Sequence, residues 1–185
     1  MLNGKDLNNI SVDRYDGAVA VATLRNINER TITGTTETTM IPTTIRGTKT
    51  IRTEQFETGS TYKIFGYCQL TTGTNQTGTI RVKIGSTTLV SESATLTSNL
   101  SSARAKFEII VTITAIGASG KARVSGDLTI FNTTPPNLGN VVGRAIITAS
   151  DVTIDTTANR DIDVTYQFGA TGNTLQVREF NIERL

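Results

Sequence analysis

The sequence predicts an all-β protein, folded as an antiparallel β-sandwich or barrel. The 35 Thr, 19 Ile and 12 Val residues make up more than a third of the 185-residue chain, and β-branched side chains pack well on a pleated sheet but lose rotamer freedom in a helix. Apolar and polar residues alternate along several segments, which turn-forming residues separate at short spacings. No stretch of roughly ten residues or more shows a helical period.

Length and composition exclude several classes of function. A chain of 19.8 kDa is one domain, long enough to bury a core without disulfides or metals. Its one cysteine, Cys68, excludes an internal disulfide, and the absence of histidine excludes a Ser-His-Asp triad and a histidine-based zinc site. A net charge of +2 from 18 basic and 16 acidic residues favours neither nucleic acid nor an anionic membrane. We therefore expect no enzyme, no cofactor and no bound metal.

The clearest strand signal is a hairpin over residues 107–131. The inward residues are expected to be Phe107, Ile109, Val111, Ile113 and Ala115 on the first strand, and Ala122, Val124, Gly126, Leu128 and Ile130 on the second. With residues 117–120 as the loop, antiparallel pairing places Ala115 opposite Ala122, Ile113 opposite Val124 and Ile109 opposite Leu128. In this register the residues predicted to be buried on one strand lie opposite those predicted to be buried on the other.

Three further segments alternate in the same way. We expect strands over residues 61–70, 79–84 and 161–168, with a surface loop over residues 71–78. Their inward residues are Tyr62, Ile64, Gly66, Cys68 and Leu70; Ile80, Val82 and Ile84; and Ile162, Val164, Tyr166 and Phe168.

Near the C-terminus the alternation changes phase. Leu175 and Val177 have one parity and Phe180 and Ile182 the other, which predicts a β-bulge near Arg178–Glu179. Residues 35–42 are expected to form a strand that ends at proline, because Pro42 cannot donate into a ladder. The apolar residues of 141–142 and 145–147 fit a strand, a loop or a subunit interface.

The first 30 residues differ from the rest. Residues 1–17 are polar, and residues 18–24 form an apolar run of small side chains that buries little surface by itself. We expect an N-terminal arm over residues 1–30 and a β domain over residues 31–185. The apolar run fits equally a docking arm and an ordinary first strand. The first ten residues lack the features of a signal peptide, and no run approaches the roughly 20 apolar residues of a membrane helix.

The motifs that could indicate phosphate, RNA or metal binding are each better explained as ordinary structural features. Residues 117–122, Gly-Ala-Ser-Gly-Lys-Ala, share letters with a phosphate-binding loop and with the GXXG loop of KH modules, but they lie between two strands and read as a hairpin turn. The carboxylate pairs Asp161/Asp163 and Asp151/Asp155 are too sparse for a Ca²⁺ site and read as solvated strand faces.

The cysteine and the aromatic residues are also accounted for by packing. Cys68 lies on an apolar strand face and is expected to be a buried, inert thiol. Tyr62 and Tyr166 are expected in the core, and Tyr67 on the outer face beside Phe65. The absence of tryptophan weakens a role in binding sugars, whose faces usually stack on aromatic rings. The sequence therefore names no catalytic, cofactor-binding or metal-binding residue.

Several segments together resemble a known family. They are Thr39–Pro42, Gly59–Ile64, Gly78–Gly85, Thr87–Leu89, Phe107–Ile113 with Gly117, and Asn181–Leu185. In their order, over about residues 36–185, they resemble the jelly-roll structural proteins of tailed-phage virions. The resemblance implies a jelly-roll sandwich that oligomerises, usually as a trimer. The chain departs from the family in lacking a helical stalk, and it lacks the spine helix of the common major capsid fold.

The resemblance and the residues together lead to a functional hypothesis. We expect a capsid decoration (cement) protein at the capsid surface of a virion, a homotrimer whose partner is the major capsid protein and whose arm reaches onto the shell. One alternative is a receptor- or glycan-binding fibre tip, which would use the loops at residues 71–78 and 133–140. Another is a jelly-roll capsid or vertex protein that builds the shell itself.

Overall fold

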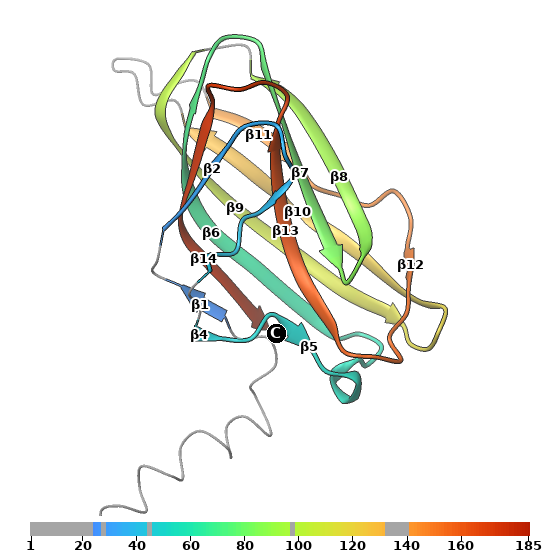
Figure 1. Cartoon of the computed structure of the whole chain (residues 1–185). Helices are drawn as coiled ribbons and strands as arrows, with labels where there is room; N and C mark the ends of the chain where they lie inside the picture. The colour runs from blue at the N-terminus through green and yellow to red at the C-terminus, as the bar shows by residue number, and fades with distance from the viewer. Residues whose placement is uncertain (1–23, 27–28, 44–45, 97–98, 132–140) are drawn as a thin grey trace, which may run out of the picture.

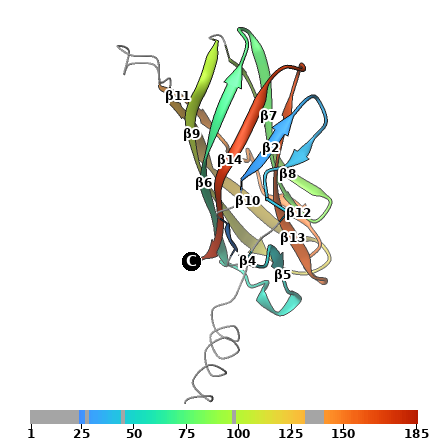
Figure 2. The same ribbon diagram turned by 60° about the vertical axis from the view of Figure 1, so that its left-hand side comes forward.

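The computed structural model describes residues 24–26, 29–43, 46–96, 99–131 and 141–185. These residues form two antiparallel sheets packed face to face, with the core between them (Figure 1 and Figure 2). The predicted all-β antiparallel sandwich is confirmed.

The larger sheet, here called sheet A, has nine strands, and the smaller, sheet B, has five. Sheet A runs in the order β11 (Val141–Ala145), β10 (Gly120–Phe131), β9 (Leu100–Ala115), β6 (Thr61–Thr72), β14 (Thr174–Arg184), β1 (Leu24–Asn26) and β4 (Arg46–Gly47), with β12 (Val152–Ile154) beside β10 and β2 (Arg30–Thr33) beside β14. Sheet B runs in the order β3 (Thr38–Thr39), β13 (Arg160–Phe168), β7 (Gln76–Ile84) and β8 (Thr87–Leu96), with β5 (Thr50–Ile51) also beside β13. A short 3₁₀ turn, η1, covers Thr53–Gln55.

The strand order is that of a jelly roll. When β3 and β5 are taken together as the second strand, eight strands follow along the chain: β2, β3/β5, β6, β7, β8, β9, β13 and β14. Their order is 1-8-3-6 in sheet A and 2-7-4-5 in sheet B, the arrangement of two interlocked Greek keys. Strands β10, β11 and β12 are inserted between the sixth and seventh strands and widen sheet A.

The alternation read from the sequence places the core correctly. Every large apolar side chain predicted to point inward on β6, β7 and β13 is buried. Phe107 of β9 packs against Phe180 of β14 with ring centroids 5.6 Å apart, and Tyr166 against Phe168 of β13 at 5.0 Å. The two aromatic pairs come from different sheets, so they fill the space between the layers.

The predicted hairpin forms, but its register is two residues away from the expected one. Ala122 lies opposite Ile113 and Val124 opposite Val111, and the register shifts between Lys121 and Ala122. A bulge and a shorter turn each contribute one residue to the difference. Because the total is even, the side chains on the other side of the bulge from the turn keep their predicted faces. Ala115, which was predicted to point inward, instead lies opposite the exposed Lys121.

Two other boundaries were predicted wrongly. The loop at residues 71–78 is short, since β6 continues to Thr72 and β7 begins at Gln76. The strand expected over residues 35–42 is reduced to Thr38–Thr39. The Met40 N–H still donates to the Val164 carbonyl of β13 at 2.7 Å, but the Ile41 N–H donates to Thr39 Oγ1 instead, and both side chains are buried in the core. Residues 141–145 form a strand, and after it Ile146 is buried while Ile147 is exposed.

The C-terminal bulge is confirmed at the predicted place. The pairing of β14 with β6 shifts between Val177 and Glu179, so that both Val177 and Phe180 are buried. Residues 24–26, which were assigned to the N-terminal arm, form β1 and pair with β14. Of the rest of the predicted arm, Arg30 begins β2, and residues 1–23 and 27–28 lie outside the described residues.

Candidate functional site

The outer face of sheet A carries an exposed aromatic side chain at its centre. Tyr67 of β6 is 47% exposed and lies opposite Lys106 of β9 on one side and Glu179 of β14 on the other. Phe65, two residues before it, is half-buried, with the Lys63 ammonium 5.3 Å from its ring centroid. The prediction that Tyr67 and Phe65 share the outer face is confirmed.

The bulge in β14 sets the polar surroundings of this ring. The Arg178 guanidinium donates hydrogen bonds to Gln69 Oε1, from Nε at 3.2 Å and Nη2 at 2.7 Å, and to Gln176 Oε1 at 3.0 Å. On the other side of the bulge, Asn181 Nδ2 donates to Glu179 Oε1 at 2.8 Å. An exposed aromatic ring surrounded by polar groups has the composition of an interface with an aromatic centre and a polar rim.

The two strands beside Tyr67 differ in charge. On its β9 side the outer face carries Arg104 and Lys106, both exposed, and on its β14 side it carries Glu179 and Glu183, both half-buried. Glu108 of β9 is paired with Lys63 at 3.0 Å. Arg178 of β14 is paired with Glu29. The charge that remains unneutralised on this face therefore changes sign from β9 to β14.

Sheet B has a polar cluster on its own outer face. The Glu37 carboxylate accepts hydrogen bonds from Thr165 Oγ1 at 2.8 Å and Lys83 Nζ at 3.1 Å, and Arg81 lies 3.5 Å away. The Thr165 hydrogen bond, followed by that of Lys83, lowers the pKa of Glu37. Burial raises the pKa of Asp163, against the effect of the hydrogen bond from Thr39.

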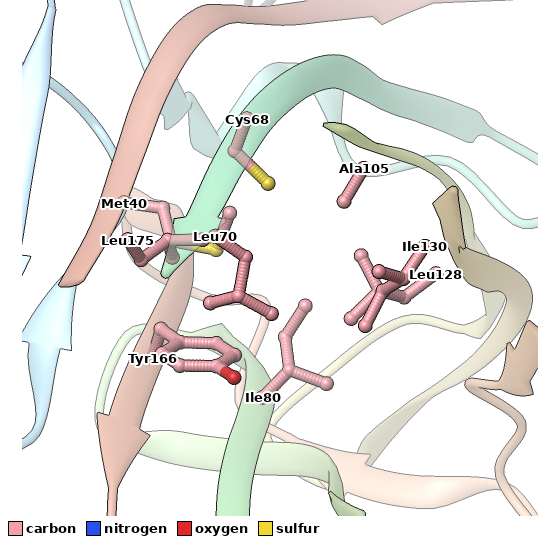
Figure 3. A pocket seen from close by; sticks show the side chains of 9 residues that line it. All are labelled: Met40, Cys68, Leu70, Ile80, Ala105, Leu128, Ile130, Tyr166 and Leu175. Carbon is pink, nitrogen blue, oxygen red and sulfur yellow. The ribbon is translucent and has the colours of Figure 1, made fainter. Parts of the chain in front are cut away.

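A narrow apolar crevice lies between the sheets, where the edge strand β8 of sheet B faces β10 of sheet A. Figure 3 shows its inner end, a cavity of about 10 Å³. The side chains around it are Met40, Cys68, Leu70, Ile80, Ala105, Leu128, Ile130, Tyr166 and Leu175. Cys68 is buried as predicted, and burial raises the pKa of its thiol to about 12, so it remains a protonated thiol at neutral pH.

The glycine-rich segment is a hairpin turn, as predicted. Gly117 has a φ of 116°, a conformation that favours glycine. Its N–H donates to Thr156 Oγ1 at 2.7 Å, and the Gly120 N–H donates to the Gly117 carbonyl at 3.0 Å. With these donors engaged within the protein, the turn does not present them to a phosphate.

The carboxylate pairs are held by neighbouring side chains. Asp161 pairs with Lys49 at 3.2 Å, Asp151 pairs with Arg123 at 3.1 Å, and Asp155 pairs with Arg160. Within the described ranges, no three His, Cys, Asp or Glu side chains gather as a metal site. The loop at residues 133–140, proposed for receptor binding, lies outside the described residues.

The sequence did not predict the charged pair at the outer end of this crevice. Glu92 of β8 and Arg144 of β11 form an ion pair there at 3.1 Å. One signal was available: Glu92 interrupts the row Val90, Ala94 and Leu96, which shares its parity. The partner of Glu92 could not be predicted, because alternation along one strand does not show which strand of the other sheet faces it.

Comparison with known proteins leaves the family open. No protein-family model and no curated protein matches the chain. Among solved structures, the chain is similar to the CBM2 module of the evolved Dit of Lactobacillus casei BL23 phage J-1, with 10% identity and a TM-score of 0.29 over 67% of this chain and 61% of that one.

Two other solved structures show comparable similarity. The binding domain of botulinum neurotoxin serotype C1 has 11% identity and a TM-score of 0.29 over 91% of this chain and 49% of that one. The polysaccharide lyase family 18 protein aly-SJ02 has 10% identity and a TM-score of 0.25 over 74% and 78%. The chain thus spans less than two thirds of the first two proteins, and TM-scores this low carry no argument about function.

In the described part of the chain, no helix is long and apolar enough to cross a membrane.

Proposed function

We propose that the protein is a virion structural protein, a capsid decoration protein that trimerises through the outer face of sheet A. The observation that carries the proposal is the exposed ring of Tyr67 at the centre of that face. Tyrosine and arginine are enriched among the residues that contribute most to binding at protein interfaces, and Arg178 is held in the frame around this ring.

The charge distribution supports a cyclic assembly. In a ring, each subunit binds its neighbour through two different surfaces. The basic side chains of β9, Arg104 and Lys106, lie on one side of Tyr67, and the acidic side chains of β14, Glu179 and Glu183, lie on the other. A rotation that brings β9 of one subunit toward β14 of the next pairs opposite charges and covers the ring between them.

Variants at exposed positions test this interface. We expect Tyr67→Arg to abolish the oligomer, because a charge would be buried at the centre of the interface without a partner. Ile116→Arg is the matched control, since Ile116 is also exposed but lies at the tip of the β9–β10 hairpin. A Tyr67→Arg protein that assembles as the wild type does would refute this interface.

The attachment to a shell is tested by truncation. Removing residues 1–23 leaves all the described strands in place. We expect the truncated protein to fold and to trimerise, yet to fail to coat purified empty heads, whereas the full chain coats them. Equal coating by both proteins would remove the role proposed for the arm.

The second candidate is a glycan-binding fibre tip. It is favoured by the same ring, because Gln69, Gln176 and Asn181 place amide groups near Tyr67, and sugars combine stacking on an aromatic face with hydrogen bonds to planar polar groups. A glycan panel distinguishes the two candidates. Binding that Tyr67→Ala abolishes would favour the fibre tip, and a blank panel at high protein concentration would exclude it.

A further inference from the structure

Of the described strands that lie at an edge of a sheet, β8 is the longest. It has ten residues, and among the described strands it pairs with β7 alone. The other edge strands have five residues or fewer. Figure 1 shows β8 at the margin of the sandwich. An edge strand presents unpaired backbone N–H and C=O groups, to which another chain can add a strand.

The composition of β8 is favourable for such pairing. The strand contains neither proline nor a basic residue, and Glu92 is its one charged side chain. A β-bulge protects one end, because the pairing with β7 shifts between Val82 and Lys83 and a bulge twists an edge away from a partner. The other seven residues, 90–96, pair with β7 without a shift. This regular stretch is the part of the edge to which a second strand could add.

Glu92 faces inward near the middle of this stretch. It lies opposite Ile80 of β7, which is buried in the core, and directly paired residues share a face of the sheet. Val90 and Leu96, which have the same parity on β8, are also buried. A carboxylate therefore occupies an otherwise apolar row, directly at the open edge.

Arg144 holds the Glu92 carboxylate in this position. Its Nη2 lies 3.1 Å from Glu92 Oε2, and Arg144 itself lies opposite Leu128 of β10, on β11 at the edge of sheet A. The pair therefore joins the two sheets on the open side of the sandwich. The Glu92 side chain is 26% exposed, so the carboxylate keeps contact with water while the guanidinium neutralises it.

We infer that Glu92 prevents β8 from pairing with β8 of a second copy of the protein. Antiparallel pairing of residues 90–96 with themselves would continue sheet B from one copy into the next, with both Glu92 side chains on the same inner face. In a register centred on residue 92 or 93 they would be direct or diagonal neighbours, close enough for the like charges to repel. The added strand would also cover the carboxylates and remove their water.

The ion pair could otherwise serve stability alone, by linking the two sheets. In that case removal of either partner would lower the free energy of unfolding to a similar extent, and neither change would alter the mass of the protein. The inference predicts different results for the two partners, because the carboxylate at the edge, and not the pair, is what opposes association.

Sedimentation velocity of three variants beside the wild-type chain, over the same concentrations, tests the inference. We expect Glu92→Val to reach at least twice the wild-type mass. Ser93→Val is the matched control, because it adds the same side chain to the neighbouring, exposed position of β8 and keeps the carboxylate; it should keep the wild-type mass. Arg144→Gln should also keep that mass, since an unpaired Glu92 charge opposes burial still more strongly.

Further measurements locate the association and separate it from misfolding. Amide hydrogen exchange of residues 90–96 should slow in the associated Glu92→Val protein, because amides at the edge gain hydrogen bonds. Glu92→Gln keeps the size of the side chain and removes its charge, so it should associate even if Glu92→Val fails to fold. Adding Ser93→Lys to Glu92→Val should restore the wild-type mass, since lysine on an edge strand opposes pairing.

Three results would overturn the inference. They are a wild-type mass for folded Glu92→Val and Glu92→Gln, association of Ser93→Val or Arg144→Gln to the same extent as Glu92→Val, and association that leaves hydrogen exchange of residues 90–96 unchanged. Each comparison is made with the mass of the wild-type protein, whatever that mass is. Failure of the proposed trimer would therefore leave this test intact.

Discussion

Replacing Gly66 with alanine tests the close approach of β6 and β14 beside Tyr67. A Cβ at residue 66 would lie 2.0 Å from the Glu179 carbonyl oxygen and 2.8 Å from Cζ of Phe107. The first of these atoms is backbone, held by the bulge in β14, and the second belongs to a ring buried against Phe180. Neither can move without displacing a strand or the core.

The expected loss of stability follows from these contacts. Overpacking costs about 1–3 kcal/mol, and two collisions with fixed atoms place Gly66→Ala near the upper end. The alanine recovers roughly 0.4–1 kcal/mol through the unfolded chain, which leaves a loss of about 2–3 kcal/mol. For a domain of this size the midpoint of thermal unfolding should fall by roughly 4–12 °C.

Urea unfolding of Gly66→Ala beside Gly73→Ala measures this loss. The nearest atom to a Cβ at residue 73 is Gln76 Cγ at 3.7 Å, an ordinary contact, so Gly73→Ala should match the wild type within about 0.5 kcal/mol. If Gly66→Ala were equally stable, the bulge would not hold Glu179 rigidly beside Tyr67, and the description of the surface around that ring would be wrong.

The remaining predictions concern charge and burial. The pKa of Glu37 is lowered on folding. Its ionised carboxylate therefore stabilises the protein above the pKa of an unfolded glutamate, and this contribution disappears as the pH falls through the folded pKa. Glu37→Gln should reduce the free energy of unfolding at pH 7 and change it little at pH 3. Burial raises the pKa of Asp163, so its ionised form destabilises the folded protein at neutral pH. Asp163→Asn should therefore increase the free energy of unfolding at pH 7 by an amount that shrinks in acid. Urea titrations at both pH values check these two variants. Cys68 should resist a thiol reagent in the native state and react fully in denaturant, and rapid native reaction would contradict its burial.

Sequence patterns predicted what depends on neighbours along the chain. Which face of β6, β7 and β13 is buried follows from alternation, because side chains on a strand change sides at every residue. The bulge at Arg178–Glu179 also follows, because it reverses the parity of apolar residues within one strand. The buried thiol of Cys68 was predicted for the same reason.

The features that the sequence did not reveal depend on contacts between distant strands. The hairpin register differed by two residues because alternation is unchanged by an even shift. The Glu92–Arg144 pair joins β8 to β11 across the sandwich, and the frame around Tyr67 joins β9, β6 and β14. These neighbours are set by the jelly-roll strand order, which brings together segments far apart in the sequence.

Sedimentation velocity of the wild-type chain over a range of concentrations, beside Tyr67→Arg and Ile116→Arg, tests the central claim most directly. We predict a species of three times the 19.8 kDa chain mass for the wild type and for Ile116→Arg, and a monomer for Tyr67→Arg. A wild-type protein that remains monomeric at every concentration would contradict assembly through the outer face of sheet A.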